Sequence, residues 1–248
     1  MNSHNPLFLE QIKNSPQAQF QDFFTQTVRP AIDITSSTQP INPGCSKFGG
    51  APDLPPGTLW PEHPKAYYRF IAQINFAEIN VSGTDLPTKG LLSLFYAEDE
   101  GEGEVFWRDE DYILAIYTSS TEELTPLLPS EAKRISRHAR RIQFTPCMDI
   151  PYDEYQTPQW PSFSHEQEDA YHTQLRDLLH SQNYLLGYPS HYSLGYDPTP
   201  GENYVALLTL DSDEKLVWEW HDGDKLMLFI DKDALKKGDF SALVADAG

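Results

Sequence analysis

Apolar side chains near the start of the chain recur with a helical period. Residues spaced i, i+3, i+4 and i+8 share one face of a helix. Such a stripe is formed by Phe20, Phe23, Phe24 and Val28. Ser15-Pro16 upstream is typical of a helix N-terminus, and Pro30 marks the end of the pattern. The pattern predicts a helical N-terminal arm over residues 1–44.

After Cys45 the sequence changes to short apolar runs separated by Gly- and Pro-rich turns, which is typical of β strands. The runs predict strands over residues 70–76, 90–96, 112–117, 141–144, 204–210 and 225–230. A capping box at Ser164 and Gln167 begins one helix, and Gly238 ends a short helix over residues 232–237. Many short strands with a few helices predict an α+β domain with an antiparallel sheet.

Two parts of the chain resemble each other. Three blocks, residues 48–52, 71–75 and 92–96, are matched in the same order by residues 185–189, 207–211 and 226–230. The offsets are 137 (187 − 50), 136 (209 − 73) and 134 (226 − 92). A nearly constant offset indicates one supersecondary unit used twice. We therefore expect one domain, residues 45–248, with two pseudo-repeated, strand-rich halves (about 45–100 and 184–235) linked by a variable strand/helix middle.

The chain is strongly acidic. Its 248 residues include 37 Asp and Glu against 18 Lys and Arg, a net charge of −19. This charge repels phosphate backbones and anionic lipids, so we expect no nucleic acid and no membrane partner, whereas a basic protein would be attracted. The acids concentrate at nearly repeat-related positions, eight in residues 98–111 and six in residues 211–224. Residues 131–141 carry a local net charge of +4, to which the sequence assigns no role.

The N-terminus lacks the basic start and apolar run of a signal peptide, and no stretch approaches the ~20 apolar residues of a membrane span. Two isolated cysteines, Cys45 and Cys147, suit a reducing compartment. We expect a cytoplasmic protein. Nothing in the sequence predicts its oligomeric state.

Tryptophans border both acidic segments, Trp107 in the first and Trp218 and Trp220 in the second. Aromatic faces beside carboxylates can hold Lys and Arg side chains through cation–π contacts. We expect the strand ends near Gln73 and Asp211 to meet in a groove between the halves. The candidate binding residues are Gln73, Glu98, Asp99, Glu100, Glu102, Glu104, Trp107, Asp211, Asp213, Trp218, Trp220 and Asp222.

No residue pattern predicts a catalytic centre, and we expect no metal or cofactor. Gly-x-Ser-x-Gly, phosphate-binding glycine loops and zinc-spaced His or Cys pairs are absent from the sequence. The acidic turn from Asp211 fails as an EF-hand, because Leu216 and Asp222 stand where Gly and Glu are required. Two alternatives stay open: a non-standard cation site of Asp211, Asp213, Asp222 and Asp224, and a carboxylate-lined groove in which Asp211, Asp213 or Asp222 serves as general acid or base.

The repeat blocks also carry a family resemblance. The front block is Ser46–Pro52 with Trp60-Pro61 and Phe70–Phe76, and the rear blocks are Leu185–Pro189, Leu207–Asp213, Asp222–Ile230 and Asp239–Ser241. Over about residues 45–245 the chain resembles the YwqG-like bacterial family. Thr209 and His221 depart from the family, which tends to have Gln and Gly there. The resemblance implies the fold and the repeat but brings no established activity; some relatives lie near bacterial toxin systems.

The charge, the tryptophans beside carboxylates and the lack of a catalytic set lead to one main hypothesis. We expect a non-catalytic acidic binding protein that engages a basic protein partner, in a toxin-immunity or antitoxin role. The alternative is an enzyme or small-ligand sensor with a carboxylate-lined groove between the two halves. Attraction between exposed charges is screened by salt, so the first hypothesis requires a strongly salt-dependent complex.

Overall fold

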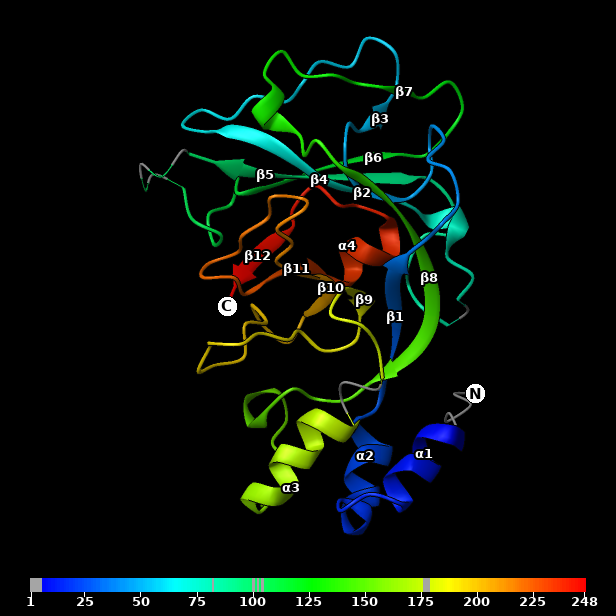
Figure 1. Ribbon diagram of the computed structural model, residues 1–248, viewed down its shortest axis with the longest axis vertical. Helices are drawn as coiled ribbons and strands as arrows, with labels where there is room; N and C mark the ends of the chain where they lie inside the picture. The colour runs from blue at the N-terminus through cyan, green and yellow to red at the C-terminus, as the bar shows by residue number, and fades with distance from the viewer. Residues whose placement is uncertain (1–5, 82, 100, 102, 104, 176–178) are drawn as a thin grey trace.

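The computed structural model describes residues 6–81, 83–99, 101, 103, 105–175 and 179–248 (Figure 1). The strands are β1 (Arg29–Ser36), β2 (Lys47–Gly49), β3 (Asp53–Leu54), β4 (Tyr67–Asn75), β5 (Leu91–Glu98), β6 (Ile113–Thr118), β7 (Thr125–Pro126), β8 (Ala139–Asp149), β9 (Tyr184–Leu186), β10 (Tyr204–Asp211), β11 (Lys225–Asp231) and β12 (Val244–Ala247). The α-helices are α1 (Pro6–Lys13), α2 (Gln21–Thr27), α3 (His165–Ala170) and α4 (Lys232–Lys237). Short 3₁₀ turns cover Ala18–Phe20, Phe76–Glu78, Ala132–Arg134 and Glu154–Gln156, and a π turn covers Tyr171–Leu175.

One ten-stranded antiparallel sheet dominates the molecule. Its strand order is β12-β11-β10-β9-β1-β8-β2-β4-β5-β6, and β3 and β7 form a separate pair. The expected α+β class is therefore wrong, and the protein is mainly β. The helices are short. Within the described residues, the predicted second-half helix is the six-residue α3 followed by a π turn, and residues 176–178 of the prediction lie outside the described part.

The centre of the sheet joins the two halves by exchanging strands. β1 and β8 pair antiparallel with each other over eight residues, from Arg29 opposite Asp149 to Ser36 opposite Ile142. β1, from the N-terminal part of the chain, also pairs with β9. β8 in turn pairs with β2, so each of the two central strands pairs with a strand of the other half. In Figure 1 these two long strands run between the upper and lower parts of the molecule.

The same hairpin geometry occurs twice. The β4–β5 ladder has a bulge between Phe70 and Ala72, and the β10–β11 ladder has one between Ala206 and Leu208. The two bulges lie 136 residues apart (206 − 70), the offset found between the blocks around Gln73 and Thr209. β2 and β9 also end in the same backbone conformation, with two consecutive residues of positive φ. Gly49 and Gly50 have φ of 63° and 68°, and Leu186 and Gly187 have φ of 62° and 72°.

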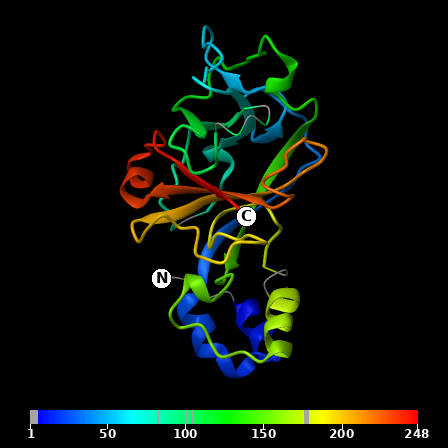
Figure 2. The same ribbon diagram turned by 90° about the vertical axis from the view of Figure 1, so that its left-hand side faces the viewer.

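Both halves contribute to one hydrophobic core. Aromatic pairs cross between them: Phe48 meets Trp218 and Tyr96 meets Trp220 edge to face, with ring centroids 5.4 and 5.1 Å apart. Figure 2 shows that the strands of the first half and those of the second half approach each other from different directions. Because the halves share their core, the loop that joins the two strands of each hairpin comes close to the other half.

The helices α1, α2 and α3 form a separate bundle at one end, away from the sheet (Figures 1 and 2). The stripe predicted in the N-terminal arm packs there, with Phe23 and Phe24 buried against Tyr171 and Phe20 and Val28 at the edge. The arm is not helical throughout residues 1–44, however, because β1 occupies residues 29–36 at the centre of the sheet. Among the described residues, no helix has the length and apolarity needed to cross a membrane.

Candidate functional site

A cleft with a volume of about 820 Å³ lies where the first half of the sheet faces the loop between β10 and β11. We call it the Trp218 cleft. One wall is formed by β4 and β5, through Arg69, Tyr96 and Glu98. The opposite wall is formed by the loop over residues 212–224, which contributes Glu214, Trp218, Glu219 and His221 among others. Glu98 of the first acidic segment and several residues of the second, Glu214 and Glu219 among them, therefore line one cavity.

The loop wall is held rigidly by Asp213. Its carboxylate accepts hydrogen bonds from the backbone N–H groups of Lys215 (2.9 Å) and Leu216 (3.1 Å), and its backbone pairs with Trp218 in both directions at 3.0 Å. The Arg140 guanidinium lies 2.6 Å from the Asp213 carboxylate. Burial disfavours the charge, but the hydrogen bonds from Arg140 and the backbone outweigh it and lower the pKa of Asp213. Asp213 is a structural residue that positions Trp218.

On the other wall, Arg69, Tyr96 and Glu98 form a connected polar group. The Arg69 guanidinium donates to Glu98 Oε2 at 3.2 Å, and the Tyr96 hydroxyl donates to the same oxygen at 3.0 Å. Burial of Arg69 opposes its charge, yet Tyr96 and Glu98 outweigh burial and raise its pKa. Burial, reinforced by the Glu98 charge, raises the pKa of Tyr96 well above its ordinary value, so this phenol stays protonated as a donor.

Three buried N–H groups in and beside the cleft lack an acceptor among the described residues. They are Arg69 Nε, Trp218 Nε1 and Trp220 Nε1. Both indoles are only 2 % exposed, and their ring centroids are 6.0 Å apart. A buried donor without an acceptor costs about 1–3 kcal/mol. Two of these donors belong to residues that line the cleft, Arg69 and Trp218, although the donor atoms themselves are shielded from solvent.

The rim of the cleft is acidic and aromatic. Glu214 and Glu219 are exposed, and neither forms an ion pair within the described part of the chain. His221 Nδ1 lies 2.9 Å from Asp224 Oδ2, and its ring meets Trp107 edge to face at 5.5 Å. Trp107 thus reaches the rim from the first acidic segment.

The structure places the other candidate residues outside the lining. Asp222 is exposed on the turn at the rim, and the Asp99 carboxylate accepts the backbone N–H groups of Gly101 and Val105. Trp220 is buried behind Trp218. Glu100, Glu102 and Glu104 lie outside the described residues.

Two candidate residues point elsewhere. Gln73 is fully buried and donates to Cys45 O and Asp53 Oδ2, both at 2.6 Å, so it belongs to an interior network. Asp211 faces Tyr192, whose hydroxyl donates to it at 3.3 Å, and burial raises the pKa of Asp211. Neither side chain lines the Trp218 cleft, so this cleft is not built from the strand ends near Gln73 and Asp211.

Arg69, Tyr96 and His221 line the cleft but were not among the residues predicted from the sequence. One signal was available for Arg69: a charged residue inside the apolar run of β4 must have a buried partner. Tyr96 and His221 become part of the cleft only through the contact between the halves.

Ser212 and His221 both contact Asp224. Ser212 Oγ donates to the Asp224 carbonyl, and His221 Nδ1 lies 2.9 Å from Asp224 Oδ2. Over the described residues, no three His, Cys, Asp or Glu side chains are grouped so that they could hold a metal ion. Of the four aspartates considered as a cation site, three face different partners: Asp211 contacts Tyr192, Asp213 contacts Arg140 and Asp224 contacts His221.

Comparison with protein families adds one finding. Residues 46–247 match the family model described as a domain of unknown function, DUF1963, and the chain belongs to this family. The match includes both walls of the Trp218 cleft. No curated protein sequence matches the chain.

Proposed function

We propose that this member of the DUF1963 family is a non-catalytic binding protein that takes a cationic segment of a protein partner in the Trp218 cleft. The observation that carries the proposal is the composition of the cleft. Exposed glutamates stand at its rim, and the Trp218 indole lines its wall. The glutamates would bind the Lys or Arg side chains of the segment.

The charges of the chain favour the same partner. Arg69 is already paired with Glu98, so Glu214, Glu219 and Asp222 leave the cleft and its rim with excess negative charge. The net charge of −19 would steer a basic protein toward the molecule before contact. A toxin-immunity or antitoxin role, in which an acidic protein covers a basic one, is the setting we infer for such binding.

The test uses fluorescence anisotropy with a labelled ten-residue peptide of alternating Lys and Gly. The triple variant Glu214→Gln/Glu219→Gln/Asp222→Asn removes three exposed acids from the rim. The matched control Glu122→Gln/Glu123→Gln/Glu166→Gln removes three exposed acids elsewhere. Binding should weaken about tenfold or more in the rim variant and much less in the control, since short-range attraction exceeds screened long-range attraction. Equal weakening in both variants would reduce the effect to net charge and contradict a site in the cleft.

A further inference from the structure

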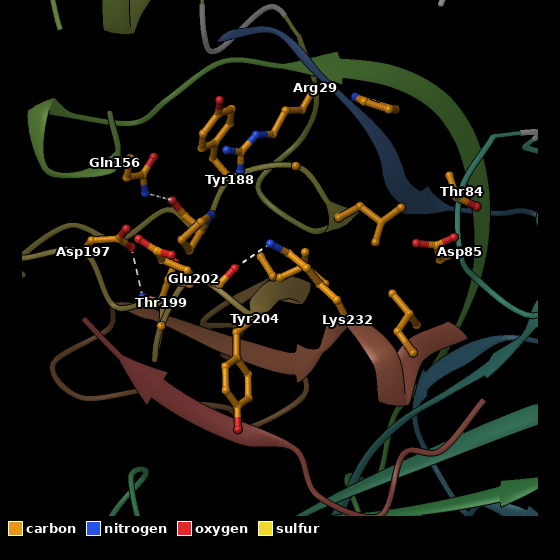
Figure 3. Close-up of a pocket in the computed structure, with 18 of the residues that line it drawn as sticks. Arg29, Thr84, Asp85, Gln156, Tyr188, Asp197, Thr199, Glu202, Tyr204 and Lys232 are labelled. Carbon is orange, nitrogen blue, oxygen red and sulfur yellow. Dashed lines mark hydrogen bonds between the residues drawn. The ribbon is translucent and has the colours of Figure 1, made fainter. Parts of the chain in front are cut away.

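A second cavity, with a volume of about 670 Å³, is lined by the starts of β1 and β10, the turn after β9 and helix α4. Residues 83–85, from the loop between β4 and β5 of the first half, complete it. Figure 3 shows its lining, with Arg29 and Tyr188 in one part and Lys232 in another. We call it the Lys232 cavity.

The Lys232 cavity is the repeat counterpart of the Trp218 cleft. Val205 stands 136 residues after Arg69 (205 − 69), and Lys232 stands 134 residues after Glu98 (232 − 98). The same offsets relate β4 to β10 (136) and β5 to β11 (134). Each cavity also faces the hairpin loop of the other half, the β10–β11 loop in one case and the β4–β5 loop in the other. Where the cleft has Arg69, the cavity has Val205, and where the cleft has Glu98, the cavity has Lys232.

Two cations in this cavity lack a carboxylate partner. Arg29 lies over the Tyr188 ring, 3.9 Å from its centroid, and forms no ion pair with any described residue. Lys232 donates its ammonium to a backbone carbonyl, that of Glu202, rather than to a carboxylate. Both side chains are exposed and face the same cavity, so neither has to break an ion pair to contact an anion there.

Tyr188 gives the cavity a fixed apolar surface. The residue is 3 % exposed, and its hydroxyl donates to the Thr27 carbonyl at 2.6 Å. Burial raises the pKa of Tyr188 to about 12, so the phenol adds no charge. Further apolar lining comes from Pro30, Leu186, Pro189, Val205 and Leu235.

Three carboxylates limit what can enter. Asp85, Asp197 and Glu202 also line the cavity, and Asp197 accepts the backbone N–H of Thr199 at 3.0 Å. In the view of Figure 3, Arg29 and Lys232 lie between Asp197 on one side and Asp85 on the other. A ligand with several negative charges would meet these acids, whereas one anionic group could lie between the two cations.

From these contacts we infer that the Lys232 cavity binds a small organic carboxylate with an apolar body. The carboxylate lies between Arg29 and Lys232, and the apolar body packs against Tyr188 and Val205. The size and mostly apolar lining are those of small-molecule sites in proteins. The ligand is distinct from the cationic segment proposed for the Trp218 cleft, so this inference does not depend on that function.

The test compares 3-phenylpropionate with its neutral amide, 3-phenylpropionamide, which has nearly the same shape. Binding is measured by ligand-observed NMR at millimolar concentrations, where weak complexes are still detected. The carboxylate should bind at least about tenfold more tightly than the amide, because its hydrogen bonds to the two cations are charge-assisted. Arg29→Gln and Lys232→Gln should each remove most of this preference.

Lys236→Gln is the matched control, because Lys236 is exposed on the same helix but does not line the cavity. Its preference for the carboxylate should stay unchanged. Equal binding of carboxylate and amide, or no binding of either at millimolar concentration, would overturn the proposal. An equal loss in Lys232→Gln and Lys236→Gln would also overturn it, since nonspecific charge would then explain the binding.

Discussion

The Lys47 ammonium lies 2.8 Å from the Asp53 carboxylate, and both side chains are almost fully buried, at 4 % and 1 % exposure. In the second half, the two equivalent positions are also six residues apart and are also in contact. There the Tyr184 hydroxyl donates to Ser190 Oγ at 2.8 Å. The positions correspond at an offset of 137 (184 − 47), so a buried ion pair in one half takes the place of two hydroxyls in the other.

Removing one partner of this ion pair should be strongly destabilising. Lys47→Met leaves the Asp53 charge buried, which we expect to lower the free energy of unfolding by about 3–5 kcal/mol. Lys47→Met/Asp53→Asn removes both charges and should recover at least half of that loss. Urea unfolding of Lys47→Met, Asp53→Asn and the double variant measures this coupling. A double variant as unstable as the sum of the single changes would contradict it.

The Asp213–Arg140 contact should make stability depend on pH. The pKa of Asp213 is lower in the folded protein than in the unfolded chain, so its contribution is complete above about pH 4 and is lost as pH falls through the folded pKa. Asp213→Asn should therefore cost about 1–2 kcal/mol at pH 7 and progressively less toward pH 2. Asp222→Asn, an exposed control on the same loop, should change stability little at either pH. A pH-independent loss in Asp213→Asn would contradict this reading.

Cys147 should react slowly with alkylating reagents. Burial, together with the Asp33 and Asp149 carboxylates, raises the pKa of this thiol to about 12. The thiolate is the reactive form, so alkylation by iodoacetamide at pH 8 should be about a thousandfold slower in the folded protein than in urea. Mass spectrometry of the labelled peptides separates Cys147 from Cys45. Comparable rates in the folded and unfolded chain would show that the thiol is accessible and ionised.

Trp218→Phe tests the role of the unpaired indole N–H. Phe keeps most of the apolar contact with Phe48 but removes a buried donor that has no acceptor among the described residues. We expect a loss of stability below about 1 kcal/mol, because removing an unsatisfied donor offsets part of the lost packing. Affinity for the Lys-Gly peptide should fall about fivefold or more. Trp160→Phe, in the helical bundle, is the control and should leave peptide affinity unchanged.

Part of the fold could be predicted from local patterns in the sequence. The apolar runs of β4, β5, β10 and β11 and the capping box of α3 were predicted correctly, because each depends on neighbouring residues. β1 was missed, since a helical stripe runs directly up to it and only Ile32 and Ile34 show its alternation. The mainly β class follows from the long pairing of β1 with β8, which no local pattern reveals.

The position of Gln73 shows why the site was only partly predictable. Arg69 and Gln73 are four residues apart on one strand, a spacing that normally places both side chains on one face. The bulge after Phe70 inserts an extra residue between them and reverses the faces. Arg69 therefore lines the cleft, while Gln73 turns to Asp53 and Cys45 in the interior. A one-residue change of register decides which residue belongs to the site.

The central claim is tested most directly by the indole N–H resonances of the five tryptophans in a ¹H–¹⁵N NMR spectrum. The Lys-Gly peptide is titrated into the protein at low salt, and a Glu-Gly peptide serves as the charge-reversed control. The proposal predicts that the Trp218 and Trp220 signals shift with the Lys-Gly peptide alone, and that the shifts are lost in Glu214→Gln/Glu219→Gln/Asp222→Asn. Unchanged Trp218 and Trp220 signals, or equal shifts with both peptides, would contradict the binding of a cationic segment in this cleft.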